Sequence, residues 1–417
     1  MIAQKKSLFD IIVNKTIEWG LIIFAVGSPF SISLAQLGFI TALIFWIVKL
    51  LFMKGIRLKG TFLDVFILIL LAGFILSSIF SIQPVKSLRA NHNVWLFSML
   101  WLFFNNTDMD QAKKVLRILL ITSILMGIYG LFQSVTGIDL WRNAVKPYGM
   151  HLYGAVGGFG LHLTYGGYQM MTALILLAIS LFGLNEMKGS TKVLVIVSTV
   201  ILILSVVASF ARTAWMGLFA GMIFLGIAGF FTGARKTSWI ILGALALIII
   251  LILSSWDMRQ RFYQIFLDLK QSARTQLWGG SLEMIKDHPI FGVGSGMFKS
   301  HFLKYRPDYV GSYGHTHNDW LAIYLRGGLV GFAGFVLMYV FYFKNMIRCS
   351  IVAYKNDKLK FSLCLGFMAA IISFMVAGWG QNYFTDSENA MLFWFVMGIS
   401  ITFYYGTMKK NRLKSKA

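Results

Sequence analysis

Long apolar runs recur along this chain and limit what it can fold into. They are about 18–22 residues long and separate short polar segments as far as residue 407; as a helix, each can cross a hydrocarbon layer about 30 Å thick. Only 13% of the 417 residues are charged, whereas a soluble protein carries about 25%. Because the runs are continuous rather than alternating, they predict helices and not barrel strands. We therefore expect an all-α polytopic membrane protein.

The pattern predicts about twelve transmembrane helices, with a large helical outside loop between the ninth and the tenth. The expected spans are residues 17–30, 32–52, 61–80, 93–104, 115–133, 163–184, 191–209, 213–231, 238–255, 318–343, 359–379 and 388–407. Spans one to nine occupy residues 1–255, and the loop forms a subdomain at 256–317. Residues 318–417 hold the last three spans and a basic tail. A second outside loop, rich in glycine and aromatic residues, is expected at 134–162.

Basic residues predict the orientation of the spans. With the N-terminus placed in the cytoplasm, the cytoplasmic segments hold 24 of the 38 lysines and arginines, as the positive-inside rule requires. Both termini are therefore expected in the cytoplasm and the loop 256–317 outside. Lys5 and Lys6 precede an apolar run without a small-residue cleavage site, which predicts an anchor and not a cleaved signal peptide. Anionic lipid explains the net charge of +22, so we expect membrane lipids and no nucleic acid as partners.

The outside loop 256–317 is long enough to form helices of its own. Its pattern predicts one helix over 259–270 and a second, amphipathic helix over 274–287. The expected apolar stripe of the second helix consists of Leu277, Leu282 and Ile285. Pro289 should end this helix, and the three glycines of 292–296 predict a loop.

Two histidines stand at the outer end of the tenth span, in the polar segment Tyr313–Trp320. Ionisable groups at a membrane boundary are costly to place and usually functional. Imidazole titrates near neutrality, so His315 or His317 is a candidate general base, and the sequence does not decide which. The alternative is a helix start capped by Asn318 or Asp319. A metal site built on His-x-His is a weaker hypothesis, since no second ligand cluster accompanies it.

Three arginines are candidates for binding an anion. Arg212 lies between the seventh and eighth spans at the predicted outer end, and Arg274 begins the second loop helix. Guanidinium groups stay charged and can bind phosphate oxygens in pairs. The structural alternatives are an arginine that reaches toward lipid headgroups and a solvated helix end. Arg326, two turns into the tenth span, is expected either to pair with Asp386 or Glu388 or to help bind the anion.

Other catalytic classes find no support in the sequence. It contains no Gly-x-Ser-x-Gly elbow, no phosphate-binding loop of the Walker type and no His-Glu-x-x-His. A secondary transporter should show inverted repeats and broken helices near the midplane, and neither pattern is visible. We therefore expect neither metal nor cofactor.

Three motifs resemble those of one bacterial membrane family. His317-Asn318, then nine residues, then Gly328-Leu-Val-Gly331 resembles the signature of O-antigen ligases. The block from Trp278 to Gly296 is similar to the core motif of the wider family of O-antigen ligases and polymerases. Ser209-Phe-Ala-Arg-Thr-Ala-Trp215 resembles the arginine segment of that family, and Phe332 stands where the ligase signature usually has a small residue.

The resemblance implies a glycosyltransferase of the bacterial inner membrane that faces the periplasm and needs no metal. Its donor would be a glycan on undecaprenyl diphosphate and its acceptor a sugar hydroxyl of lipid A–core. Arg212 and Arg274 would clamp the diphosphate, while His317 would take the acceptor proton in a direct displacement with inversion. An apolar groove between spans would hold the polyprenyl tail. The expected substrate-binding residues are His315, Asn318, Arg326, His162 and Tyr165, with Gln169 and Gln381 as weaker candidates to line the cleft.

Two alternatives stay open beside the ligase. A polymerase, or a protein O-oligosaccharyltransferase of the same superfamily, would pass the glycan to another acceptor. A transporter of lipid-linked glycans would carry no catalytic base, and its charged residues should line a central cavity rather than one face. The sequence leaves the glycan, the acceptor sugar and the oligomeric state undetermined.

Overall fold

The computed structural model describes residues 7–142, 145, 152–271, 273–311 and 313–414. Within these residues the chain is helical and contains no β-strand, so the predicted class of an all-α polytopic membrane protein is confirmed. Nine described helices are long and apolar enough to cross a membrane. They are α2 (Ile32–Phe52), α6 (Met109–Thr136), α7 (His162–Phe182), α8 (Gly189–Ala208), α9 (Arg212–Phe231), α10 (Arg235–Ser254), α14 (Asp319–Asn356), α15 (Lys358–Ala377) and α16 (Ser387–Lys414).

The other three predicted spans are shorter or more polar helices. Helix α1 (Leu8–Gly27) carries the charged residues Asp10, Lys15 and Glu18, and α3 (Asp64–Ile79) has only 16 residues. The short η1 (His92–Phe97) leads into α5 (Ser98–Asn106). Each packs against a longer helix, since α1 lies along α2, α3 along α14 and α5 along α16. The expected number of about twelve is reached only when these three are included.

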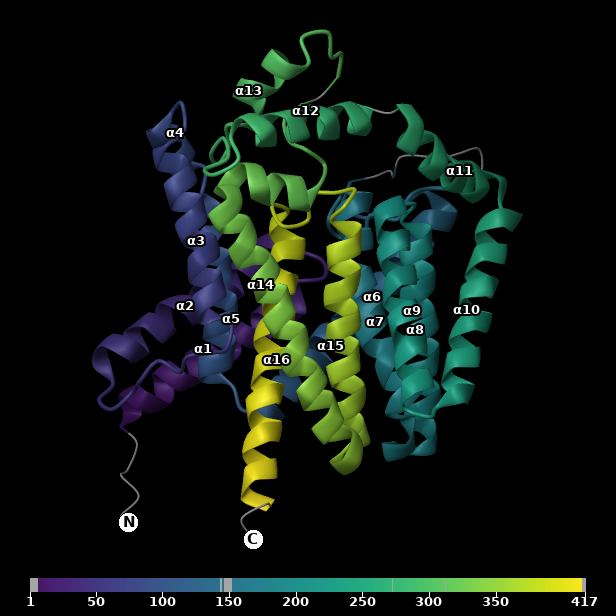
Figure 1. Ribbon diagram of the computed structural model, residues 1–417. Coiled ribbons are helices and arrows are strands. Elements are labelled where there is room, and N and C mark those ends of the chain that lie inside the picture. Colours follow the sequence, from purple (N-terminus) through teal and green to yellow (C-terminus); the bar gives the residue numbers. More distant parts are fainter. Residues whose placement is uncertain (1–6, 143–144, 146–151, 272, 312, 415–417) are drawn as a thin grey trace.

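The loop subdomain and the end of the last helix lie on opposite faces of the bundle (Figure 1). Helices α11 (Trp256–Gln271), α12 (Ala273–Asp287) and α13 (Phe298–Tyr305) lie across one end, which we call the loop face. Helix α16 ends at the other end, which we call the opposite face. This arrangement agrees with the three crossings, by α14, α15 and α16, that separate the loop from the end of the last helix, while the side of the membrane that each face occupies stays a prediction.

The loop subdomain has a small apolar core of its own. Its buried members include Leu277, Met284, Met297, Phe302 and Tyr309. The expected stripe on α12 was wrong at Leu282, which is 51% exposed. Residues 277, 281 and 284 follow the helical period and face the core, so Ser281 and Met284 are buried where the prediction had Leu282.

Helix α14 is broken at Gly328, whose φ of 60° and ψ of −164° interrupt the helical geometry. The loop before α13 braces this break: the N–H groups of Val293 and Gly294 donate to the carbonyl of Leu325, and the N–H of Leu329 donates to the carbonyl of Ile290. Backbone groups freed by the break are thus satisfied again, as burial requires. Beyond the break, α14 continues to Asn356, about three and a half turns past the expected end of the tenth span at residue 343.

Glycines bring α3 and α14 into close contact. A β-carbon on Gly73 would lie 2.3 Å from the α-carbon of Gly331, so the two backbones touch at this point. Small residues allow such approaches between membrane helices. The second glycine of the Gly-Leu-Val-Gly motif therefore has a packing role in this fold.

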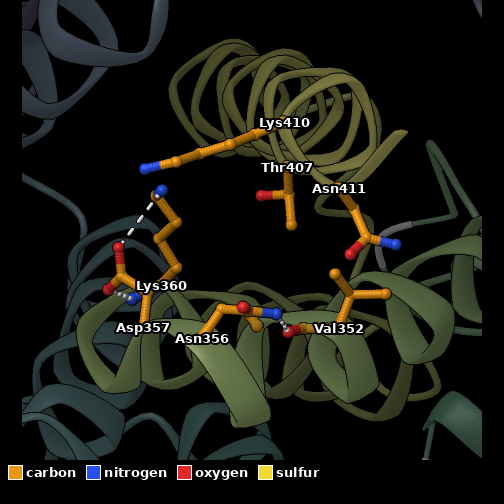
Figure 2. Close-up of a pocket in the computed structure, with 8 residues that line it drawn as sticks. Val352, Asn356, Asp357, Lys360, Thr407, Lys410 and Asn411 are labelled. Carbon is orange, nitrogen blue, oxygen red and sulfur yellow. Dashed lines mark hydrogen bonds and ion pairs between the residues drawn. The ribbon is translucent and has the colours of Figure 1, made fainter. Parts of the chain in front are cut away.

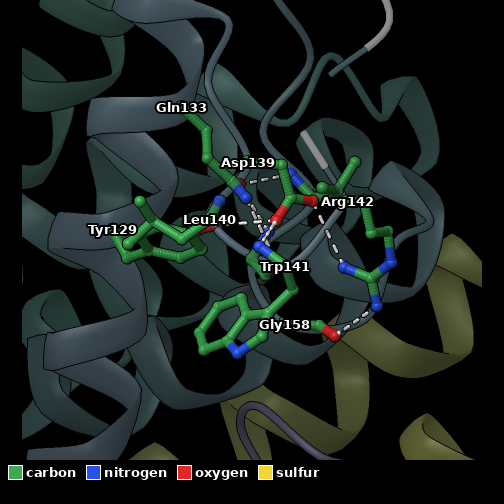
Figure 3. A network of polar contacts seen from close by, with 9 residues as sticks. Tyr129, Gln133, Asp139, Leu140, Trp141, Arg142 and Gly158 are labelled. Carbon is green, nitrogen blue, oxygen red and sulfur yellow. Dashed lines mark hydrogen bonds and ion pairs between the residues drawn. The ribbon is translucent and has the colours of Figure 1, made fainter. Parts of the chain in front are cut away.

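A polar network fixes the loop between α6 and α7 (Figure 3). Asp139 accepts hydrogen bonds from the Tyr129 hydroxyl and the Trp141 N–H, both at 3.0 Å, and pairs with Arg142 at 3.3 Å. Arg142 also donates to the carbonyl of Gly158 at 2.9 Å. Burial acts to raise the pKa of Asp139, but these donors outweigh it and lower the pKa. Residues 143–144 and 146–151 of the predicted 134–162 loop lie outside the described part of the chain.

Candidate functional site

His317 lies in a turn at the loop face, directly before α14. Its φ of 49° is in the left-handed region, which histidine adopts more readily than bulky apolar residues do. The ring Nδ1 lies 3.3 Å from Oε1 of Gln381. The ring centroid is 4.0 Å from that of His315, so the two histidines of the motif lie side by side.

The turn is held by residues 378–386, which we call the 378–386 loop. The N–H of Asp319 donates to the carbonyl of Gly378 at 2.7 Å, and the buried Asp319 carboxylate accepts from the N–H of Phe384 at 3.0 Å. The Thr316 hydroxyl lies 3.3 Å from Oδ1 of Asn382. Three separate contacts therefore fix the position of His317 relative to the loop that binds it.

Arg212 is the first residue of α9, at the same face. Phe210, two residues before Arg212, has a φ of 56°. This is a strained conformation for a large apolar residue. Its carbonyl accepts from Nε of Arg261 at 3.2 Å, and the carbonyl of Ser209 lies 3.0 Å from Nδ1 of His162. Strain of this kind gathers at functional sites. In the described residues, Phe210 and His317 are the non-glycine residues with positive φ.

Arg274 reaches the 378–386 loop from the first turn of α12. A β-carbon added to Gly380 would lie 3.5 Å from NH1 of Arg274 and 2.7 Å from Cγ2 of Thr213. The Thr213 hydroxyl lies 3.3 Å from that of Tyr383. The start of α9, the start of α12 and the His317 turn thus meet around one loop, and the two arginines and the histidine expected from the sequence come from three separate segments.

The surroundings of His317 keep its imidazole neutral. Burial lowers the pKa of His317 to about 4, and the neighbouring His315 and the positive charge of Arg274 lower it further, while the hydrogen bond to Gln381 opposes them. Burial also lowers the pKa of His315. Because an amide oxygen faces Nδ1, this nitrogen carries the hydrogen and Nε2 keeps its lone pair. A neutral ring with a free nitrogen can accept a proton at neutral pH.

Arg326 lies elsewhere, and its expected pairing with Asp386 or Glu388 is wrong. Its guanidinium donates to Oδ1 of Asn91 at 3.0 Å and to the Ser295 hydroxyl at 2.9 Å. It also lies 4.2 Å from the ring centre of Phe74. The break at Gly328 turns the first part of α14 toward α3 and the 289–296 segment, so Arg326 joins these elements rather than the His317 turn.

Two further candidates occupy structural positions. Tyr165 is fully buried and donates to the carbonyl of Met126 at 3.0 Å, which corrects the expectation that it lines a cleft. Asn318 is the N-cap of α14 and accepts from the N–H of Leu321 at 3.1 Å, the capping role considered from the sequence. Gln169, a weaker candidate, is likewise buried and donates to the carbonyl of Ser123. Of the cleft-lining candidates, Gln381 contacts His317, and His162 contacts the carbonyl of Ser209 just before α9.

An apolar cavity of about 460 Å³ lies between α9, α14 and α15. Its lining includes Phe231, Tyr354 and Phe361, which belong to the ends of these helices at the opposite face. The cavity is therefore separate from the site, and the groove expected between spans for a polyprenyl tail stays a prediction.

The 378–386 loop contributes more contacts to the site than the single residue expected from it, Gln381. Its nine residues, Gly-Trp-Gly-Gln-Asn-Tyr-Phe-Thr-Asp, form a polar interruption between two apolar helices, and this was the available signal. The contact of Gln381 with His317 spans 64 positions of the chain. Local patterns do not report such pairings.

The comparisons with known proteins fall on the same segments. Residues 197–336 match a family model described as O-antigen ligase. This range contains Arg212, Arg274 and His317. Over 295 residues the chain is 23% identical to an uncharacterized protein of Haemophilus influenzae. This match covers 66% of this chain and 70% of that protein.

The fold and the family match together describe a multi-pass membrane protein whose residues 197–336 are similar to O-antigen ligases. The recognition of the O-antigen ligase and polymerase superfamily, made from the sequence motifs, is confirmed.

Proposed function

We propose that this protein is an O-antigen ligase, a metal-independent inverting glycosyltransferase with its site on the periplasmic side of the bacterial inner membrane. The donor is a glycan on undecaprenyl diphosphate, and the acceptor is a sugar hydroxyl of lipid A–core. The observation that carries the proposal is the meeting of His317, Arg274 and the Arg212 end of α9 at the 378–386 loop. The histidine and the two arginines lie in the range that matches the O-antigen ligase model, while the loop lies beyond it.

The reaction is a direct displacement at the anomeric carbon. The acceptor oxygen forms a bond to that carbon, while the bond from the carbon to the diphosphate oxygen breaks and its electron pair leaves with the diphosphate. The acceptor hydroxyl gives its proton to Nε2 of His317, which the Gln381 contact leaves free. Attack from the face opposite the leaving group inverts the anomeric configuration, and a positioned base contributes about 10²–10⁴-fold to such a step.

The two arginines act on the leaving group. Negative charge grows on the diphosphate as the glycosidic bond breaks, and guanidinium groups fixed beforehand stabilise it without reorganisation. Arg212 also stands at the N-terminus of a 20-residue helix, where the helix dipole favours an anion. Bound diphosphate would in turn raise the pKa of His317 and make it a stronger base in the complex than in the free protein.

The first experiment is deletion of the gene in its host, followed by gel analysis of lipopolysaccharide. Complementation would use the wild type and the His317→Ala, Arg212→Ala and Arg274→Ala variants, with membrane insertion checked by immunoblot. For a ligase, polymeric O-antigen is lost from lipid A–core while long carrier-linked glycan accumulates. The three variants should insert and fail to restore the polymer.

The second candidate function is an O-antigen polymerase, because the family match supports the superfamily and the core block is common to both activities. The same gel separates the two. A lipid A–core that carries a single repeat unit after deletion identifies a polymerase and rejects the ligase assignment. Full rescue by His317→Ala would reject the proposed base whichever of the two activities is lost.

A further inference from the structure

A small polar cavity lies at the opposite face, where the ends of α14, α15 and α16 meet (Figure 2). Its volume is about 40 Å³, and since one water needs about 10–15 Å³ measured in this way, a group larger than a water fits. The polar residues that line it are Asn356, Asp357, Lys360, Thr407, Lys410 and Asn411. The site proposed for glycan transfer lies at the other face and uses none of them.

Positive charge exceeds negative charge in this cavity. Lys360 is largely buried, with 12% of its side chain exposed, and its Nζ lies 3.1 Å from Oδ2 of Asp357. Lys410 lines the cavity from α16, and in Figure 2 its ammonium group points to the same side of the cavity as that of Lys360. The positive charge of Lys113, from α6, also lowers the pKa of Asp357. Two ammonium groups therefore face a cavity that holds one carboxylate, and that carboxylate is already paired.

Hydrogen-bonding groups complete the lining. Thr407 is buried, and its hydroxyl has no oxygen or nitrogen partner among the described residues. Its polar neighbour is the thiol of Cys349, a weak hydrogen-bonding group. Figure 2 shows the hydroxyl directed into the cavity. A buried hydroxyl without a good partner is costly, and an oxygen ligand in the cavity would satisfy it.

We infer that this cavity binds a phosphate group at the opposite face of the bundle, held by Lys360 and Lys410 and by the hydroxyl of Thr407. A phosphate oxygen accepts hydrogen bonds from both ammonium groups and from the hydroxyl, and its charge balances the excess of lysine. The cavity opens at the ends of membrane-spanning helices, so the phosphate comes from one of two sources, the headgroup of an anionic phospholipid or free phosphate.

The test measures thermal unfolding of the purified full-length protein with each source in turn. In the lipid arm, the protein is reconstituted in phosphatidylcholine nanodiscs with increasing phosphatidylglycerol. In the second arm, it is kept in neutral detergent and titrated with inorganic phosphate, against sodium chloride at equal ionic strength. A rise of the midpoint in the lipid arm alone identifies the headgroup, and a rise with inorganic phosphate identifies the free ion.

Lys410→Gln is compared with Lys409→Gln, which removes the same charge from the adjacent residue of α16 but does not line the cavity. Lys410→Gln should weaken the dependence on phosphatidylglycerol or phosphate about tenfold, as expected for loss of a hydrogen bond to a charged group, while Lys409→Gln keeps it. Thr407→Val, nearly equal in shape, should weaken it as well. The inference is overturned if neither source stabilises the wild type, or if Lys410→Gln and Lys409→Gln respond alike.

Discussion

His317 Nδ1 lies 3.3 Å from Oε1 of Gln381, across 64 positions of the chain. The histidine stands before α14 and the glutamine in the loop before α16. The amide oxygen accepts a hydrogen from Nδ1, so Nε2 keeps its lone pair. In the proposed reaction, Gln381 is therefore a positioning residue that acts through His317.

Gln381→Leu should lower kcat about 10- to 100-fold, short of the roughly 10²–10⁴-fold that loss of a general base costs. The KM for the lipid-linked donor should stay unchanged, because the ring is misplaced while the arginines remain. Gln381→Glu should retain much of the activity, since its carboxylate accepts the same hydrogen. The measurement is glycan transfer by purified protein in detergent. The control is Gln276→Leu on the exposed face of α12, and equal rates for Gln381→Leu and this control would contradict the role.

The low pKa of His317 predicts the pH dependence of transfer. A base works only when it is deprotonated, so activity is lost as the pH falls through its pKa. With the pKa of the free protein at about 4, kcat/KM should be flat from pH 8 down to about pH 5.5, where an ordinary histidine of pKa about 6.5 would have lost most of its activity.

His315→Gln tests the cause of this shift. It removes a neighbour that lowers the pKa of His317, so the acid limb of kcat/KM should move to higher pH. A limb near pH 6.5 in the wild type would exclude a buried, neutral His317 as the base.

Arg274→Ala should reduce kcat about 10²–10³-fold, the usual effect of removing one preorganised electrostatic contact from a transition state. Arg274→Lys should recover only part of this, because an ammonium group lacks the paired geometry of guanidinium. The matched control is Arg306→Ala in the same subdomain, where Arg306 pairs with Glu283 at 2.6 Å away from the 378–386 loop. If both alanine variants lose equal activity, the effect belongs to the subdomain fold and not to charge at the site.

The fold class could be predicted, and so could the placing of Arg212, Arg274 and His317 at one face of the bundle, because the relevant signals are local. The length and continuity of an apolar run indicate a membrane helix directly. The helical period and the position of Pro289 predicted helices over 259–270 and 274–287, and α11 and α12 begin and end within a few residues of these ranges. The stripe was wrong at Leu282 because this residue is apolar but does not follow the helical period of the buried face.

The pairing of helices was not predictable in the same way. Lipid-facing runs are alike in composition, so the sequence does not tell which run packs against which. The partner of Arg326 is Asn91, 235 positions away, whereas the prediction paired Arg326 with acidic residues near the last outside loop. The 378–386 loop contacts α7, α9 and α14. Its role in the site therefore becomes visible only when the positions of these helices are known.

Arg326→Met should destabilise the protein without removing its chemistry. The substitution removes the guanidinium donor from Asn91 and Ser295, although the Ser295 hydroxyl still donates to Asn91, and hydrogen bonds to a charged group contribute about 1.5–3 kcal/mol each. Thermal unfolding in detergent should show a lower midpoint, while transfer per folded molecule stays near the wild-type value. An unchanged unfolding midpoint with lost activity would contradict the structural role and favour a role of Arg326 in substrate binding.

Gly328→Ala should prevent the first part of α14 from reaching its position. The φ of 60° and ψ of −164° lie in a region that is essentially open to glycine alone, and a β-carbon there would meet the carbonyl oxygen of Ile290 and the backbone of Phe291. We expect a loss of stability beyond the roughly 1–3 kcal/mol of the strained backbone, seen as poor accumulation in membranes and a lower unfolding midpoint. Gly243→Ala, at a helical glycine with open space around it, should be neutral or slightly stabilising.

The same substitution also tests whether the break serves the site. Residues 319–327 connect the break to the His317 turn, so any Gly328→Ala protein that folds should have a displaced histidine. Its kcat should fall while donor binding through Arg212 and Arg274 persists. If Gly328→Ala matches Gly243→Ala in both stability and transfer, α14 does not need the break, and the geometry assigned to His317 is wrong.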